Sequence, residues 1–260
     1  MTQSKGYVDP QYLAAVAERL KEAKERSYSL MHVQTGQRVL DVGCGPGTDT
    51  LPLAHLVGST GEVVGVDTDA DMIAQANLSA ASAGVASWVT HQQADTMALP
   101  FETASFDACR CERVLQHVMH PDQAVSEMVR VTKPDGWVVA GEPDWGTHSI
   151  STSEVDIERR LARVHAERCI RNGYIGRQLY SMFTQQQLRE ISVSLETLFL
   201  TQYAVARNLF LLDCREREAV VAGLVTEDDL QRWRASLEQA EADGVFFGSM
   251  CGVMVAGRRR

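Results

Sequence analysis

The chain has 260 residues, of which 45% are hydrophobic and 23% are charged, and its formal net charge is −9. This length suits one large α/β domain with additions, and the composition is that of a soluble globular protein. The acidic balance argues against a nucleic-acid partner, because the phosphate backbone favours a basic surface. The sequence shows no secretory signal and no apolar run long enough to span a bilayer, so we expect a cytoplasmic protein without a membrane span.

The cysteines are scattered along the chain, at Cys44, Cys109, Cys111, Cys169, Cys214 and Cys251. A chain of this size does not need disulfides to stabilise its core, so this scatter predicts free thiols in a reducing compartment. Cys109 and Cys111 are two residues apart, which is not the spacing of a zinc site. We therefore expect no bound metal.

The first predicted element is an amphipathic helix that ends before Gly36. Its apolar face recurs at steps of three and four residues, at Leu13, Val16, Leu20, Ala23, Ser27 and Leu30. Strands and helices then alternate. The predicted strands are "RVLDVG", residues 62–67, and segments within 87–95, 105–112 and 137–144, while helices are predicted over 69–83 and from Pro121. This alternation predicts a parallel, doubly wound sheet.

After Trp145 the pattern changes. A charged helix is predicted over 153–169, a glycine-containing loop over 171–179, a short helix over 185–191, a strand over 194–205 and a helix over 208–222. Thr226 begins a further helix, because an acidic residue follows it three positions later as in a capping box. The last predicted strand covers 244–258. Helical insertions are therefore expected after the fifth and sixth strands.

The stretch "VLDVGCGPGTDT" is a glycine-rich turn that follows a buried strand. Its glycines, Gly43, Gly45 and Gly47, have the spacing G-x-G-x-G, whereas a dinucleotide fingerprint would have its third glycine at Thr48. Asp41 precedes the turn, and a carboxylate there would repel a pyrophosphate and attract an α-amino group. These features disfavour a nicotinamide dinucleotide and a dehydrogenase.

Two further acids follow the next two strands. Asp67 is placed to accept hydrogen bonds from ribose hydroxyls, and Asp95 to accept one from an adenine amino group. Met72 or Met97 would then lie against the adenine ring. S-adenosylmethionine carries an α-amino group, a ribose diol and an adenine amino group, and each of these groups would face one of the three acids.

The motifs resemble those of class I S-adenosylmethionine-dependent methyltransferases, in the group that includes ubiquinone and menaquinone methylases. The residues that carry the resemblance are "VLDVGCGPG", "VVGVD", "QADTMALPFETASFDACRCERVLQHV" and "EMVRVTKPDGWVVAGEPD". It covers Arg38 to Asp144 well, and later residues only through the order of elements. It implies a seven-stranded, mostly parallel sheet of order 3-2-1-4-5-7-6 with strand 7 antiparallel.

The resemblance also implies where the cofactor binds. In such proteins the glycine turn, the acids after strands two and three, and the residues just after strand four approach S-adenosylmethionine. The predicted cofactor-binding residues are Asp41, Gly43, Cys44, Gly45, Gly47, Asp67, Thr68, Met72, Asp95, Thr96, Glu112 and Arg113. We divide the single predicted domain into a helical cap (1–35), a cofactor-binding core (36–145), a helical insertion or lid (146–190) and C-terminal strands with a helical insertion (191–260).

Three residues are candidates for catalysis. His117 lies near the expected methyl group, where it would either deprotonate an acceptor or cap local backbone. Glu142 and Asp144 are expected just beyond the end of strand five, where ligands of open α/β sheets bind. They would either meet the acceptor or bind backbone amides in a turn.

Candidate acceptor-binding residues lie further along the chain. Trp145 and His148 follow the same strand. Asn172, Tyr174 and Arg177 belong to the predicted loop, which we expect to act as a lid, with Arg177 holding an acidic group of the acceptor or forming a surface ion pair.

We expect a methyltransferase for a small-molecule acceptor, in which alignment of the acceptor with the methyl group is the main catalytic effect. The methylated atom is oxygen, nitrogen or carbon, and the protein a monomer or homodimer. The alternatives are an enzyme of the same fold that binds the cofactor but catalyses a non-methyl step such as cyclisation, and a non-catalytic binding subunit.

Overall fold

A computed structural model describes residues 19–260, which form two compact units. The core unit consists of Leu20–Glu142, Gln178–Ser194 and Met254–Arg260. The insertion unit contains Pro143–Arg177 and Leu195–Val253. The predicted N-terminal helix is present as α2 (Lys21–Leu30), and its expected residues before Arg19 lie outside the described part of the chain.

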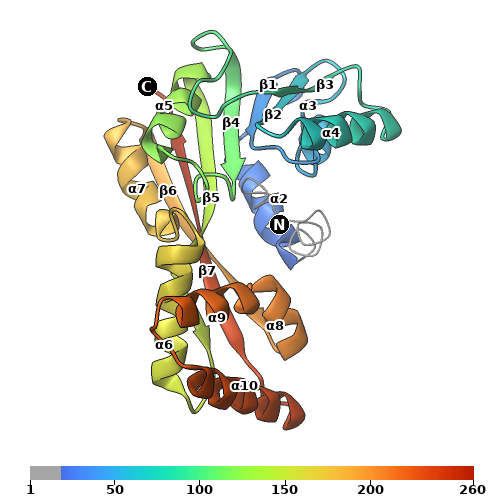
Figure 1. Ribbon diagram of the computed structural model, residues 1–260. Helices are drawn as coiled ribbons and strands as arrows, with labels where there is room; N and C mark the ends of the chain where they lie inside the picture. The colour runs from blue at the N-terminus through green and yellow to red at the C-terminus, as the bar shows by residue number, and fades with distance from the viewer. Residues whose placement is uncertain (1–18) are drawn as a thin grey trace. The chain divides into compact units, whose positions relative to one another are not determined.

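A seven-stranded sheet runs through the structure in the order β3-β2-β1-β4-β5-β7-β6 (Figure 1). Its strands are β1 (Arg38–Val42), β2 (Glu62–Asp67), β3 (Val89–Gln93), β4 (Phe106–Glu112), β5 (Thr132–Ile150), β6 (Arg189–Leu200) and β7 (Gly248–Arg258). The pairs among β1 to β5 are parallel. Strand β7 is antiparallel, and Arg259 exchanges backbone hydrogen bonds with Asp135 and Gly136 at its end. The predicted fold class and strand order are confirmed.

The core unit also contains α3 (Thr50–Val57), α4 (Ala70–Ser82), α5 (Pro121–Val131) and most of α7 (Ile175–Gln185). Helices α3 and α4 pack beside β2 and β3 (Figure 1). Helix α4 begins where the Asp69 carboxylate accepts a hydrogen bond from the Asp71 backbone N–H, and ends before Gly84, whose φ is +72°. Both ends match the capping signals in the sequence.

Strand register brings the polar residues of the core to one edge of the sheet. Asp41 pairs with Gly65 of β2 on one side and with Arg110 of β4 on the other. Because parallel strands end at the same edge, the turn after β1, Asp67 at the end of β2 and Glu112 at the end of β4 gather there. This edge forms the candidate site.

The insertion unit consists of helices together with the C-terminal parts of β5 and β6 and the N-terminal part of β7. It contains α6 (Val155–Val164), the π-helix η1 (His165–Cys169), α8 (Tyr203–Leu209), α9 (Leu212–Val221) and α10 (Glu227–Ala242). The capping box at Thr226 is present, with the Thr226 hydroxyl and the Asp229 carboxylate each accepting a backbone hydrogen bond. No helix among residues 19–260 is long and apolar enough to cross a membrane.

The predicted end of the fifth strand is wrong. Strand β5 continues to Ile150, so Glu142, Asp144, Trp145 and His148 lie within the strand and not beyond its end. Pairing with neighbouring strands stabilises extended backbone in a stretch whose polar composition favours a turn.

The predicted loop over 171–179 ends early, because α7 begins at Ile175 and places Arg177 on a helix. The buried side chains Ile175, Leu179, Met182 and Phe183 form a helical stripe that the two glycines obscured. A helix predicted over 185–191 is also wrong, since β6 begins at Arg189.

Candidate functional site

The turn after β1 has a conformation that only glycine adopts readily. The φ angles of Gly43, Gly45 and Gly47 are +71°, +51° and +83°. A Cβ added at Gly43 would lie 3.0 Å from Cγ1 of Val114 and closer still to Cγ2, so this glycine allows the turn to pack on the loop after β4. A Cβ at Gly45 would have no atom within 4 Å. The turn therefore has open space at Gly45, as a cofactor cradle requires.

Asp67 connects this turn to the end of β2. One carboxylate oxygen accepts a hydrogen bond from the Gly45 backbone N–H at 3.0 Å, and the other accepts one from the Asp69 backbone N–H at 3.0 Å. Each oxygen retains a second lone pair. Asp67 is thus positioned by the backbone and can still accept hydrogen bonds from a ribose diol.

The other predicted cofactor residues occupy different environments. Asp95 is exposed, and its carboxylate accepts a hydrogen bond from the Met97 backbone N–H at 2.8 Å. Thr68 is exposed, whereas Met72 and Thr96 are buried. The side chain of Cys44 is buried where it would contact a Cβ at Gly65, so only its backbone is available to a ligand.

A buried charge cluster lies beside the glycine turn. Arg110, in the middle of β4 and 1% exposed, pairs with Asp41 at 3.0 Å, Asp49 at 3.1 Å and Glu112 at 2.7 Å. Lys24 of α2 pairs with Asp49 at 2.8 Å and Glu112 at 3.3 Å. Nε of Arg113 adds a longer contact with Glu112 at 3.8 Å. Three carboxylates therefore face three cations, and the cluster ties α2 to β1, β4 and the start of α3.

The carboxylates of this cluster differ in their affinity for protons. Burial raises the pKa of Asp41 to about 7, although the charge of Arg110 opposes the shift. Burial acts on Asp49 in the same direction, but Arg110 and Lys24 hold its pKa well below the usual range. Oδ2 of Asp41 is buried without a hydrogen-bond partner among the described residues. An unpartnered carboxylate oxygen is the kind of group that accepts a hydrogen bond from an ammonium group, which is the role predicted for Asp41.

The loop after β4 is held by a carboxylate from β5. Glu142 accepts hydrogen bonds from the backbone N–H groups of Val114 at 2.7 Å and Leu115 at 2.6 Å. Burial raises the pKa of Glu142 to about 8, and these hydrogen bonds oppose the shift. The contacts favour the interpretation in which this acid binds backbone amides. Glu142 positions the loop, and Arg113 within it has a φ of +57°.

His117 lies in the same loop. Part of the residue is exposed to solvent, and neighbouring protein atoms desolvate the ring enough to lower its pKa, an effect to which the charge of Arg113 adds. The imidazole is therefore neutral at neutral pH, which is the form that accepts a proton. The role of His117 as a base stays a prediction.

The predicted acceptor residues all belong to the insertion unit. Asp144 is buried and forms a double contact with Arg177, from Nε at 2.6 Å and from Nη2 at 2.9 Å. The guanidinium of Arg177 lies 5.0 Å from the ring centre of Tyr174. Asp144 and Arg177 therefore neutralise one another, which is the ion-pair interpretation left open by the sequence.

Trp145 and His148 are also engaged with protein groups. The Trp145 ring lies against His165, with ring centres 4.3 Å apart, and its backbone N–H donates to the carbonyl of Gly173. Nδ1 of His148 is 3.0 Å from the Arg215 guanidinium. Asn172 is half-buried in the short turn before α7.

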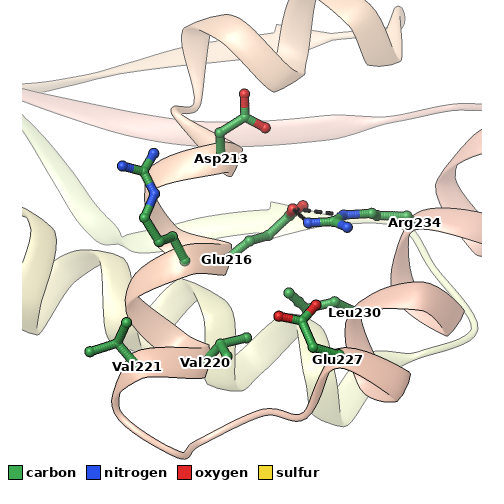
Figure 2. A pocket seen from close by; sticks show the side chains of 8 residues that line it. Asp213, Glu216, Val220, Val221, Glu227, Leu230 and Arg234 are labelled. Atoms are coloured by element: carbon green, nitrogen blue, oxygen red, sulfur yellow. Dashed lines mark hydrogen bonds and ion pairs between the residues drawn. The ribbon is translucent and has the colours of Figure 1, made fainter.

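A pocket of about 490 Å³ lies between α9 and α10 in the insertion unit (Figure 2). It is lined by Asp213, Glu216, Arg217, Val220, Val221, Glu227, Leu230 and Arg234. Glu216 and Arg234 form an ion pair of 2.6 Å inside it. Among residues 19–260, no group of three or more histidine, cysteine or acidic side chains is arranged to hold a metal ion.

Sequence reasoning missed several of these residues. Arg110 was detectable, because it is an arginine in the middle of an otherwise buried strand. Lys24, Asp49 and Arg215 carry no comparable local signal, since their importance comes from partners far away in the sequence.

Comparisons with known proteins find relatives in sequence and in overall fold. A family model described as a methyltransferase domain matches residues 40–140. An uncharacterized 37.1 kDa protein in a transposon of Streptomyces fradiae is 33% identical over 236 residues, which are 91% of this chain and 66% of that protein. The ubiquinone/menaquinone biosynthesis C-methyltransferase UbiE of Pseudomonas aeruginosa is 39% identical over 113 residues, which are 44% of each protein. The chain thus spans only part of the curated relatives that it matches.

Solved structures share the fold at low identity. YcgJ from Bacillus subtilis has a TM-score of 0.61 and 22% identity, covering 94% of this chain and 98% of that one. Geranyl diphosphate C-methyltransferase from Streptomyces coelicolor has a TM-score of 0.61 and 16% identity, covering 99% and 86%. The [4+2]-cyclase SpnF has a TM-score of 0.54 and 19% identity, covering 92% and 80%. By its core motifs, its strand order and these matches, the chain contains a methyltransferase domain at residues 40–140 and has the class I S-adenosylmethionine-dependent methyltransferase fold.

Proposed function

We propose that this chain transfers the methyl group of S-adenosylmethionine to a small-molecule acceptor. The observation that carries the proposal is the glycine turn, which is open at Gly45 and connected to the Asp67 carboxylate. The match to a methyltransferase domain supports it. UbiE acts in ubiquinone and menaquinone biosynthesis and the Streptomyces coelicolor enzyme is named for geranyl diphosphate, which supports a small acceptor.

The residues of the core unit fit the cofactor. Asp67 would hold the ribose hydroxyls, Gly45 would allow close approach of the backbone, and Oδ2 of Asp41 would accept from the ammonium group. The bound cofactor supplies an activated methyl group on a sulfonium. The protein then has to orient the acceptor and exclude water, and these effects account for most of the acceleration that such a transfer needs.

We propose His117 as the base if the acceptor must lose a proton, because its lowered pKa keeps the ring neutral. We also retain Trp145, Asn172 and Tyr174 as proposed acceptor contacts. Arg177 would bind an acidic acceptor only after leaving Asp144, which makes a neutral acceptor the simpler expectation.

Calorimetry with S-adenosylmethionine and S-adenosylhomocysteine tests cofactor binding. We expect both to bind at one site, and we expect Asp67→Ala to abolish binding because the diol loses its acceptor. Asp67→Asn keeps one carbonyl oxygen for the Gly45 N–H and removes the charge, so weakened binding there assigns the effect to the carboxylate. Glu102→Ala is the control, since Glu102 is an exposed acid of the same unit. Absence of binding by the unmodified chain would refute the proposal.

Product mass distinguishes methyl transfer from a non-methyl reaction. SpnF shows that this fold also occurs in a protein named as a [4+2]-cyclase, so the fold alone does not choose between them. A gain of one methylene unit, together with formation of S-adenosylhomocysteine, identifies methyl transfer. An isomeric product of unchanged mass identifies cyclisation.

A further inference from the structure

Two cysteines of the insertion unit lie side by side on packed helices. Cys169 is the last residue of η1, and Cys214 lies in the first turn of α9, which packs against η1. The Cys169 thiol is within hydrogen-bonding reach of the Cys214 sulfur. Both thiols are free and half-buried, so small reagents can reach them.

The π-helix is an irregular element that ends at Cys169. The backbone N–H of Ile170 donates to the carbonyl of His165, which is the five-residue step of a π-helix. Such single-turn elements are rare and occur often at functional sites. Gly173 lies so close to this turn that a Cβ there would be 2.7 Å from Cα of Ala166. The backbone of the π-helix is therefore tightly packed against the turn at Gly173.

The two thiols have unequal acidity. The hydrogen bond from Cys169 lowers the pKa of Cys214 to about 6, against the effect of burial. The charges of Arg217 and Arg215 act in the same direction as the hydrogen bond, and that of Glu218 opposes them. The same hydrogen bond and burial raise the pKa of Cys169. Cys214 is thus the more acidic thiol of the pair, which suits an attacking cysteine with Cys169 as the resolving one.

The remaining cysteines lack this arrangement. Cys44, Cys109 and Cys111 are buried, and burial raises the pKa of each thiol, which makes them unreactive. Cys251 of β7 is half-buried and belongs to the same unit as the pair. It serves as an internal control.

We propose that Cys214 and Cys169 form a redox-active dithiol that is oxidised by low-molecular-weight disulfides such as oxidised glutathione. The Cys214 thiolate attacks one sulfur of the disulfide, forming a mixed disulfide and releasing one glutathione thiolate. The Cys169 thiol then loses its proton and attacks the Cys214 sulfur, releasing the second glutathione. The dithiol gives up two electrons to the disulfide, and the product is one bond between η1 and α9.

Alkylation of the reduced, unmodified chain tests the first step. Iodoacetamide labelling is followed at each cysteine by peptide mass spectrometry between pH 5 and pH 9. The lowered pKa gives Cys214 a larger thiolate fraction at pH 6 than an ordinary cysteine has, and the lower intrinsic nucleophilicity of an acidic thiol offsets part of this advantage. We expect Cys214 to react about tenfold faster than Cys251 at pH 6. Equal rates at that pH would overturn the proposal.

Incubation with oxidised glutathione tests the second step. The unmodified chain should lose two hydrogens by mass, and peptide mapping should locate the bond between residues 169 and 214. Cys169→Ser should retain one glutathione on Cys214, because the resolving thiol is absent. Cys251→Ser should behave as the unmodified chain. The proposal would also be overturned if the chain stays reduced after incubation with oxidised glutathione and lacks this bond. It would likewise be overturned if Cys169→Ser carries no glutathione adduct while its thermal unfolding is unchanged.

Discussion

A pair of glycine substitutions separates the structural role of the β1 turn from its role toward the cofactor. Gly43 and Gly45 both have positive φ, but a Cβ at Gly43 meets Val114 whereas a Cβ at Gly45 meets nothing within 4 Å. Gly43→Ala therefore adds a steric clash to the conformational strain, and Gly45→Ala adds strain alone. The two variants make the same chemical change two residues apart.

The magnitudes follow from these geometries. A non-glycine residue in the left-handed region costs about 1 to 2 kcal/mol, and forcing an extra carbon into a packed contact adds about 1 to 3 kcal/mol. We expect Gly45→Ala to lose about 1 to 2 kcal/mol of unfolding free energy and Gly43→Ala to lose about 2 to 5 kcal/mol. For a chain of this size, each kcal/mol lowers the melting temperature by about 2 to 4 °C.

Val114→Ala provides the matched control, because it removes the carbons that the new Cβ would meet. The double variant Gly43→Ala/Val114→Ala should be more stable than the sum of the two single effects by about 1 to 3 kcal/mol. Gly45→Ala should instead fold nearly normally and bind S-adenosylhomocysteine at least about tenfold more weakly, since its Cβ occupies the open side of the turn.

Thermal unfolding and calorimetry measure these effects. The reasoning is refuted if Gly43→Ala is no less stable than Gly45→Ala. It is also refuted if Val114→Ala does not reduce the loss of unfolding free energy that Gly43→Ala causes. Full cofactor affinity in Gly45→Ala would show that the open space at Gly45 is not where the cofactor binds.

Three further outcomes follow from the buried polar groups. Arg110→Met should cost about 3 to 5 kcal/mol in urea unfolding, because it leaves buried carboxylates without their partner, and an unchanged midpoint would contradict the cluster. Glu142→Gln should weaken S-adenosylhomocysteine binding about tenfold in calorimetry, because the amide replaces one accepting oxygen with an N–H donor beside the backbone N–H groups of the loop after β4, and unaltered affinity would exclude this positioning role. Burial lowers the pKa of both His148 and His165 far below the usual value, and the charge of Arg215 acts in the same direction. Their neutral forms therefore stabilise the fold above about pH 6.5, and this part of the stability is lost as the pH falls. Acidification from pH 7 to pH 5 should thus lower the melting temperature of the unmodified chain relative to that of His165→Phe, and equal shifts in the two proteins would contradict the burial of this ring.

Local pattern was sufficient for the core of the fold. Alternating strands and helices, with Asp69 and Gly84 at the ends of α4, predict elements whose stabilising contacts lie mostly within one β–α unit. The glycine spacing and the acid at Asp67 are likewise local, because they describe one turn and one strand end. The insertion unit was predicted less well, since Gly176 interrupts a helical pattern and the polar residues of β5 are typical of a turn.

The sequence by itself determined the sheet order and the class of cofactor, the former through a family resemblance and the latter through the chemistry of a short turn. Only the tertiary structure decided what the charged side chains do. Asp41 meets Arg110, Glu142 meets the backbone after β4, and Asp144 meets Arg177. A buried carboxylate must find a donor or a cation, and which one it finds depends on strand register and helix packing across tens of residues. Periodicity and spacing carry no information about those partners, and for this reason the acids that resembled catalytic groups in the sequence proved to be engaged in holding the structure.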